Sequence, residues 1–169
     1  AYKRATLIFS DLEKLREASR LGAIQLVFSG KAHPADAVGK QEIREVHNAM
    51  RDLEGEVTAV YLENYTMDLA SLMTAGVDVW LNTPLPPYEA SGTSGMKAAL
   101  NGVVNFSVLD GWWIEGWIEG TTGWAIGPEP GAPVSEAERR ARELQDLYSK
   151  LEYLIIPTYY HRRDEWTTI

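Results

Sequence analysis

Runs of apolar residues alternate along the chain with segments of helical periodicity. Short apolar runs at 24–28, 57–62 and 77–81 have the length of buried strands. Between them, residues 35–53 and 67–75 carry apolar side chains at spacings of three and four, which is typical of amphipathic helices. Strands that alternate with helices in this way predict an α/β fold, with a Rossmann-like parallel sheet and helices on both of its faces.

The segment before the first strand has two competing helix starts. Apolar side chains recur every three or four residues, which predicts one amphipathic helix over residues 2–20 whose inward seam is Ala5, Ile8, Leu12 and Leu15. Ser10 followed by Glu13 also fits a capping box, and that interpretation starts the helix later. The pattern alone leaves both starts open.

The second half of the chain continues the alternation. A proline-rich connection at 83–87 leads toward a short helix that ends near Gly102, and residues 103–109 alternate like a strand. A Trp-rich loop follows at 110–124, and a long helix is predicted over residues 135–154. The Trp side chains could stack on sugars, but packing in the core or against another domain is the preferred interpretation.

Composition narrows the class of protein. A chain of 169 residues with 45% hydrophobic residues can bury one core, so we expect a single domain over residues 1–169. The formal net charge of −8 argues against nucleic acid as a partner, because binding a phosphate backbone needs an excess of Lys and Arg. No apolar stretch reaches the roughly 18–20 residues that cross a membrane. The absence of Cys excludes thiolate metal sites and suits the cytoplasm.

Several polar residues follow predicted strands, where open parallel sheets bind their ligands. Lys31, Tyr65 and Glu89 lie just after three of the strands and could converge. The loop at 91–95 consists of small residues before a short helix, and its backbone amides could hold a phosphate or a sugar hydroxyl. Lys97 lies within the first turns of that helix, where a cation gains nothing from the helix dipole. On these grounds it is either a functional amine or an ordinary surface lysine.

The motif Glu89-Ala-Ser-Gly-Thr-Ser-Gly-Met-Lys97 resembles the cofactor-lysine signature of the glycogen, starch and maltodextrin phosphorylases. Further segments similar to that family occur in the family's order at 2–4, 29–34, 62–65, 77–82 and 108–112. The chain therefore resembles the C-terminal, cofactor-binding part of an α-glucan phosphorylase. This resemblance implies the C-terminal half of a glycosyltransferase-B fold, with both ends of the chain truncated relative to the full enzyme.

The resemblance implies an activity and a cofactor. Phosphorylases of this family use inorganic phosphate to release the terminal glucose of an α-1,4-glucan as glucose 1-phosphate. Pyridoxal 5′-phosphate is the implied cofactor, attached to Lys97, and its 5′-phosphate acts as acid and base through the substrate phosphate. A cytoplasmic, allosteric enzyme of carbohydrate metabolism is implied, with no metal ion.

The resemblance also implies a role for each matched residue. Lys3 matches a lysine that binds the substrate phosphate, and Glu89 matches a carboxylate that accepts hydrogen bonds from glucose hydroxyls. Ser91 and Gly92 offer their amides to the same sugar. The residues implied to hold the cofactor are Lys97, Thr93, Ser94 and Tyr65. Lys97, Lys3 and Glu89 form the implied catalytic set.

Partners and alternatives follow from the family's two-domain site. The implied partners are the glucan, phosphate and the preceding domain of the same enzyme, without which we expect the chain to be inactive. Apolar surface exposed by its absence predicts self-association into a homo-oligomer. One alternative is a nucleotide-sugar glucosyltransferase of the same fold, which carries a carboxylate where Lys97 stands. Another is a non-catalytic carbohydrate-binding module, which needs neither Lys97 nor Lys3.

Overall fold

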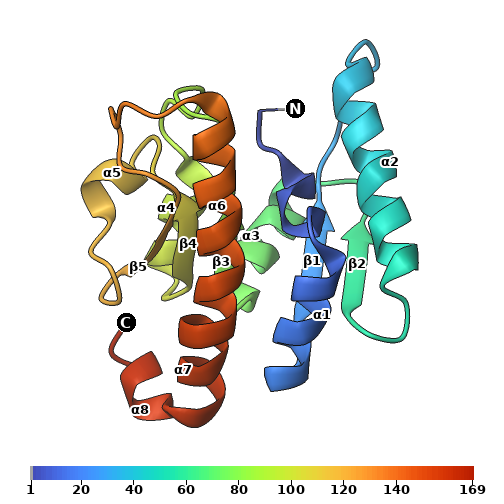
Figure 1. Cartoon of the computed structure of the whole chain (residues 1–169). Helices are drawn as coiled ribbons and strands as arrows, with labels where there is room; N and C mark the ends of the chain where they lie inside the picture. Colours follow the sequence, from blue (N-terminus) through green and yellow to red (C-terminus); the bar gives the residue numbers. More distant parts are fainter. Residues whose placement is uncertain (1) are drawn as a thin grey trace.

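All strands run parallel in the computed structural model, which describes residues 2–169 (Figure 1). They form two sheets, one of β1 (Gln25–Ser29) with β2 (Thr58–Leu62), the other of β3 (Val79–Asn82), β4 (Val104–Val108) and β5 (Gly123–Ile126) in that order. In register, Gln25 lies opposite Thr58 and Val79 opposite Val104. The predicted parallel α/β arrangement is confirmed.

Helices connect the strands and pack against the sheets. They are the 3-10 helix η1 (Ala5–Phe9), α1 (Leu12–Leu21), α2 (Ala37–Asp52), α3 (Met67–Gly76), α4 (Thr93–Leu100), α5 (Trp113–Gly116), α6 (Glu136–Lys150), the π-helical turn η2 (Leu151–Ile155), α7 (Ile156–His161) and α8 (Arg163–Trp166). In Figure 1, α6 lies in front of the β3–β5 sheet and packs on β5, while α4 packs on β3 and β4 from behind. Among residues 2–169, no helix has both the length and the apolar character needed to cross a membrane.

The single helix predicted over residues 2–20 is wrong, because η1 and α1 are separate. Arg4 has left-handed backbone angles, with φ at 47°, so a helix cannot run through it from residue 2. Asp11 is extended, and its side chain accepts a hydrogen bond from the Lys14 amide at 3.1 Å, so it caps α1. The later start is therefore confirmed, with Asp11 rather than Ser10 as the cap.

The strand β5 begins within the segment at 110–124 that the sequence predicts as a Trp-rich loop, and it extends past the end of that segment to Ile126. Gly123 begins the strand with φ at 144°, and a Cβ at this position would lie 2.0 Å from the Asn105 carbonyl oxygen. Only a glycine lets the chain approach β4 so closely. Because the strand has only four residues and starts with a glycine, its sequence resembles that of a turn, and the sequence predicts no strand there.

The core confirms that the Trp-rich segment serves packing. Trp113 and Trp124 are 1% and 4% exposed, and Trp112 packs tilted against Trp113 with ring centroids 5.2 Å apart. The main core joins the β3–β5 sheet to η1, α1 and α6, and Leu26 and Phe28 of β1 pack against it. Its buried members are Leu7, Ile8, Leu15, Leu53, Val57, Val104, Phe106, Val108, Trp124, Ile126, Leu147, Tyr148 and Ile155. Exposed apolar side chains lie on α3 and α4, at Met67, Leu72 and Leu100, and in the Trp-rich segment itself, at Ile114 and Ile118.

Tyr148 joins α6 to the N-terminal segment. Its buried hydroxyl donates to the Ile8 carbonyl oxygen at 3.0 Å and accepts from the Asp11 amide at 2.7 Å. Burial is the main reason why the pKa of Tyr148 rises from 10 to about 12. The neutral phenol thus holds the junction between η1 and α1 in place.

Replacing this phenol tests its role in the fold. We expect Tyr148→Phe to lower the free energy of unfolding by about 1–3 kcal/mol, because it leaves two polar backbone groups without their partner. The same substitution at the exposed Tyr153 serves as control and should change stability little. Denaturant titration by circular dichroism measures both variants.

The raised pKa predicts how this difference depends on pH. Below pH 10 Tyr148 is neutral in both states, so its contribution is fully present. As pH rises from 10 toward 12, the unfolded chain ionises first, and the contribution is lost. The stability gap between wild type and Tyr148→Phe should narrow over that interval, and a constant gap would contradict this account.

Candidate functional site

The N-terminal segment is docked on the connection that follows β3. The Leu85 amide donates to the Tyr2 carbonyl oxygen at 2.7 Å. The Thr83 hydroxyl lies 3.0 Å from the carbonyl oxygens of Lys3 and Arg4, and it can donate to either. These contacts place residues 2–4 at the carboxyl end of the β3–β5 sheet, where ligands bind in parallel α/β folds.

This docking brings the Lys3 ammonium onto the Glu89 carboxylate. The Lys3 Nζ lies 2.6 Å from Glu89 Oε1 and 2.5 Å from Oε2. Glu89 is 5% exposed, whereas the Lys3 side chain is 47% exposed. A buried carboxylate requires a charged or hydrogen-bonding partner, and Lys3 supplies it. Both residues were predicted as site residues, but the sequence does not indicate that they pair.

Asp110 holds the other side of the Glu89 loop. It follows β4, and its Oδ2 accepts a hydrogen bond from the Glu89 amide at 2.9 Å while its Oδ1 accepts from the Gly111 amide at 3.0 Å. The Trp112 amide donates to the Ser91 carbonyl oxygen at 2.8 Å. Asp110 was not predicted as a site residue. Its position directly beyond a strand, beside a glycine, is the signal that points to it.

The segment predicted as a loop at 91–95 leads into α4, but its last three residues already belong to the helix, which begins at Thr93. Gly92 precedes the helix with φ at 84°, and no side chain caps the first turn. A Cβ on Gly92 would lie 3.3 Å from Glu89 Oε1 and 3.1 Å from Trp112 Cδ1, so the glycine keeps the space beside the carboxylate open. Thr93 is exposed and Ser94 is half-buried in that first turn.

Lys97 lies in the last turn of α4, which corrects its expected place in the first turns. The helix begins at Thr93 and ends at Leu100, so the helix dipole favours a cation at Lys97. Its side chain is exposed, and within residues 2–169 its ammonium makes no hydrogen bond or ion pair. Tyr65 is half-buried just before α3, which packs against α4.

Lys31 and Tyr65 were expected to converge with Glu89. In the part of the chain that the structure describes, neither residue makes a hydrogen bond or an ion pair with Glu89. Lys31 and Tyr65 follow β1 and β2, whereas Glu89 follows β3. These strands belong to two different sheets, so their carboxyl ends do not share one continuous edge. The groups that contact Glu89 come from Lys3 and Asp110 instead.

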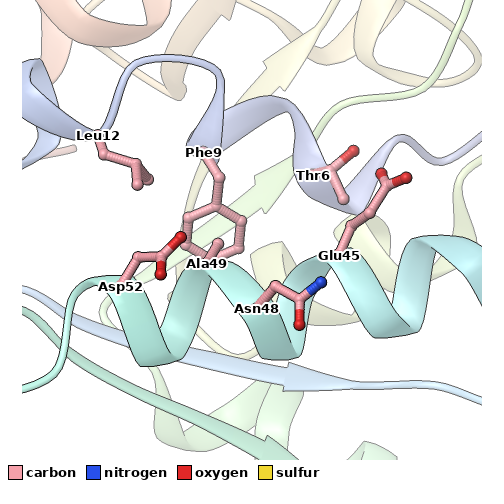
Figure 2. Close-up of a pocket in the computed structure, with 7 residues that line it drawn as sticks. All are labelled: Thr6, Phe9, Leu12, Glu45, Asn48, Ala49 and Asp52. Carbon is pink, nitrogen blue, oxygen red and sulfur yellow. The ribbon is translucent and has the colours of Figure 1, made fainter.

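Two cavities lie away from these residues. One of about 330 Å³ is a groove between η1 and α2, and Figure 2 shows the carboxylates of Glu45 and Asp52 among its lining side chains. The other, of about 580 Å³, is lined by residues of the α2 end and the start of β2, His47 and Arg51 among them. The acidic groove is unsuited to a phosphate, because its carboxylates repel anions. The Lys3–Glu89 pair therefore stays the best candidate site.

Comparison with solved structures identifies the fold. The fold resembles HepE of Anabaena, solved in complex with UDP-glucose, with a TM-score of 0.64 over 99% of this chain and 38% of that chain. At 19% sequence identity this likeness shows the fold alone, which is the Rossmann-like α/β fold of glycosyltransferase-B structures.

The family follows from sequence comparison. The carbohydrate phosphorylase family model matches residues 2–124. The chain is 50% identical over 167 residues to the maltodextrin phosphorylase of Thermococcus litoralis, covering 98% of this chain and 20% of the relative. It is 47% identical over 163 residues to the glycogen phosphorylase of Aquifex aeolicus, covering 95% of this chain and 23% of the relative. The chain belongs to the carbohydrate phosphorylase family, and it spans about a fifth of the length of these relatives.

The contact between the two loops of the site yields a prediction. A Cβ on Gly111 would lie 2.6 Å from the Ser91 carbonyl oxygen and 2.9 Å from that of Glu89. Gly120 shares a positive φ but has open space around its Cβ position. We expect Gly120→Ala to cost about 1 kcal/mol for its backbone angles alone. Gly111→Ala should cost an additional ~1–3 kcal/mol because the loops must separate. Thermal unfolding of the two variants measures the difference, and equal costs would contradict the close approach.

Proposed function

We propose that this chain carries the cofactor and the phosphate-binding lysine of an α-glucan phosphorylase, which releases glucose 1-phosphate from α-1,4-glucan with inorganic phosphate. The observation that carries the proposal is the pairing of Lys3 with buried Glu89, because it unites two separate segments of the family-matched region in one site. Residues 1–169 act in this proposal as a single cofactor-binding domain. The rest of a phosphorylase polypeptide closes the site, and the chain alone is inactive.

Lys3 has the donors that a substrate phosphate needs. Its ammonium has three N–H donors, and Glu89 engages it through both carboxylate oxygens, which leaves donor capacity for a phosphate oxygen. The half-exposed side chain keeps that capacity accessible. Because the amine is already held in place, binding a phosphate requires little ordering of the lysine.

Glu89 serves the sugar in this proposal. Its two oxygens have further lone pairs beyond those facing Lys3, and these accept hydrogen bonds from glucose hydroxyls. The amides of Ser91 and Gly92 lie in the same loop, and the absence of a side chain at Gly92 lets a sugar approach the carboxylate. Sugar and phosphate are thereby bound by two residues that contact each other.

The residues around α4 fit pyridoxal 5′-phosphate. Lys97 offers an exposed amine that has no partner within residues 2–169, as covalent attachment of a carbonyl compound requires. In this proposal Thr93 and Ser94 hold the cofactor's phosphate at the uncapped helix start, and Tyr65 packs beside the cofactor. When bound, the cofactor supplies a phosphate with a pKa near neutrality that exchanges a proton with the substrate phosphate. Lys3 balances part of the negative charge that two neighbouring phosphates bring.

Attachment at Lys97 is tested by chemical labelling. The chain is incubated with pyridoxal 5′-phosphate, reduced with borohydride and digested for mass spectrometry. We expect the pyridoxyl group mainly on Lys97, and its loss in Lys97→Arg. Lys31→Arg, at another exposed lysine, is the matched control and should leave the labelling unchanged. Labelling spread over many lysines would contradict the cofactor role.

The activity is tested by transplanting the chain. Replacing the matching region of the Thermococcus litoralis maltodextrin phosphorylase, to which it is 50% identical, should yield a protein that forms glucose 1-phosphate from maltodextrin and phosphate. Lys3→Met in this chimera should lower kcat/KM by about 10²–10³-fold, the effect of removing one donor aimed at a reacting group.

The alternatives give different results in the same assays. A nucleotide-sugar glucosyltransferase would transfer glucose from UDP-glucose and need no pyridoxal phosphate. A carbohydrate-binding module would bind maltodextrin equally well with Lys3→Met or Lys97→Arg. A folded chimera that lacks phosphorolysis altogether would refute the proposal.

A further inference from the structure

Arg4 makes a second set of contacts beside the Lys3 site. Its Nη1 lies 2.6 Å from Glu143 Oε2, its Nε donates to the Thr83 carbonyl oxygen at 2.9 Å, and its Nη2 donates to that of Pro84 at 2.7 Å. Glu143 belongs to α6 and is 0% exposed. One guanidinium therefore ties the N-terminal segment to the end of β3 and to α6.

Stability alone does not explain this buried ion pair. Burying two charges costs much of what their attraction returns, and a pair of well-packed apolar side chains is often as stable. Glu143 pays an additional cost, because its Oε1 is buried without a hydrogen-bond partner in the part of the chain that the structure describes. In some proteins such a pair instead specifies one arrangement of the segments that it joins, and we infer this role for Arg4 and Glu143.

The backbone conformation of Arg4 links its side-chain contacts to the position of Lys3. Arg4 has φ at 47° and ψ at 52°, a left-handed conformation that costs a residue with a side chain about 1 kcal/mol. The conformation reverses the chain between Lys3 and η1. As a result, Lys3 contacts Glu89 while Arg4 contacts Glu143.

We propose that Arg4 and Glu143 are positioning residues that hold Lys3 on Glu89. The guanidinium fixes the segment at both carbonyl oxygens after β3, and Glu143 fixes the guanidinium from α6. These contacts fix the backbone position of Lys3, although its side chain is half exposed. The role of this arrangement in binding phosphate rests on the proposed function, whereas the geometric coupling does not.

The test separates positioning from stability. The double variant Arg4→Met/Glu143→Leu replaces the ion pair with apolar side chains and leaves no unpaired charge, so the chain should stay folded, with a Tm lowered by the loss of the two hydrogen bonds to the Thr83 and Pro84 carbonyl oxygens. The ammonium signal of Lys3 in a ¹⁵N-lysine-labelled chain reports its contact with Glu89 and is assigned by its loss in Lys3→Met. Lys150, whose ammonium contacts Glu119 Oε1 and the Ala125 carbonyl oxygen, is the internal control.

We expect the double variant to lose the protected Lys3 signal and to keep the Lys150 signal. Its affinity for inorganic phosphate, measured by ³¹P NMR titration, should fall about tenfold, because a small displacement of a binding group has effects of this size or larger. Arg4→Lys is the second variant: it keeps the charge opposite Glu143 but cannot hold both carbonyl oxygens, and it should show the same loss.

Two results would overturn the positioning role. One is a protected Lys3 signal that persists in either folded variant, and the other is the absence of such a signal in the wild-type chain. A wild-type chain that shows the signal but binds no phosphate would count against the phosphate role of Lys3 and leave the geometric coupling intact. The two failures are therefore distinguishable.

Discussion

The buried carboxylate of Glu89 is the constraint on which the site depends. An ionised carboxylate that is 5% exposed must be paired, and its partner, Lys3, is 86 positions away in the sequence. The N-terminal segment must therefore lie across the end of β3, where Thr83 and Leu85 bind its backbone. From the other side, Asp110 accepts the Glu89 amide. Three segments distant in sequence thus meet at one residue.

The parallel fold explains why these segments meet. Strands β3, β4 and β5 end at the same edge, so the loops after β3 and β4 lie side by side there. Gly111 allows those loops to approach within contact distance, and Gly92 keeps space beside the carboxylate. The main core lies below this edge and leaves the loops to carry polar groups. The strand β4 is buried along its whole length, and the candidate site residues lie on the loops that it positions.

Membership of the phosphorylase family and the local geometry are independent observations, and both support the proposed function. The family model covers residues 2–124, which include Lys3, Glu89 and Lys97. The geometry adds what a motif cannot express: Lys3 is already engaged by Glu89, whereas Lys97 has no partner within residues 2–169. In the proposed function, the amine that Glu89 holds binds a phosphate, and the accessible amine of Lys97 attaches the cofactor. The two lysines differ in environment in the way that their proposed roles require.

The sequence by itself determined the elements whose signals are local. The helices at 37–52 and 67–76 and four of the strands follow from apolar spacing, and the motif ending at Lys97 indicated the family. Only the tertiary structure decided where η1 ends, because the Tyr148 hydroxyl reaches Asp11 from 137 positions away. The tertiary structure also decided the strand β5, which depends on its close approach to β4. It likewise decided the Lys3–Glu89 and Arg4–Glu143 pairs. Charge pairing and close backbone approach depend on distances in space, which the periodicity of a sequence does not contain.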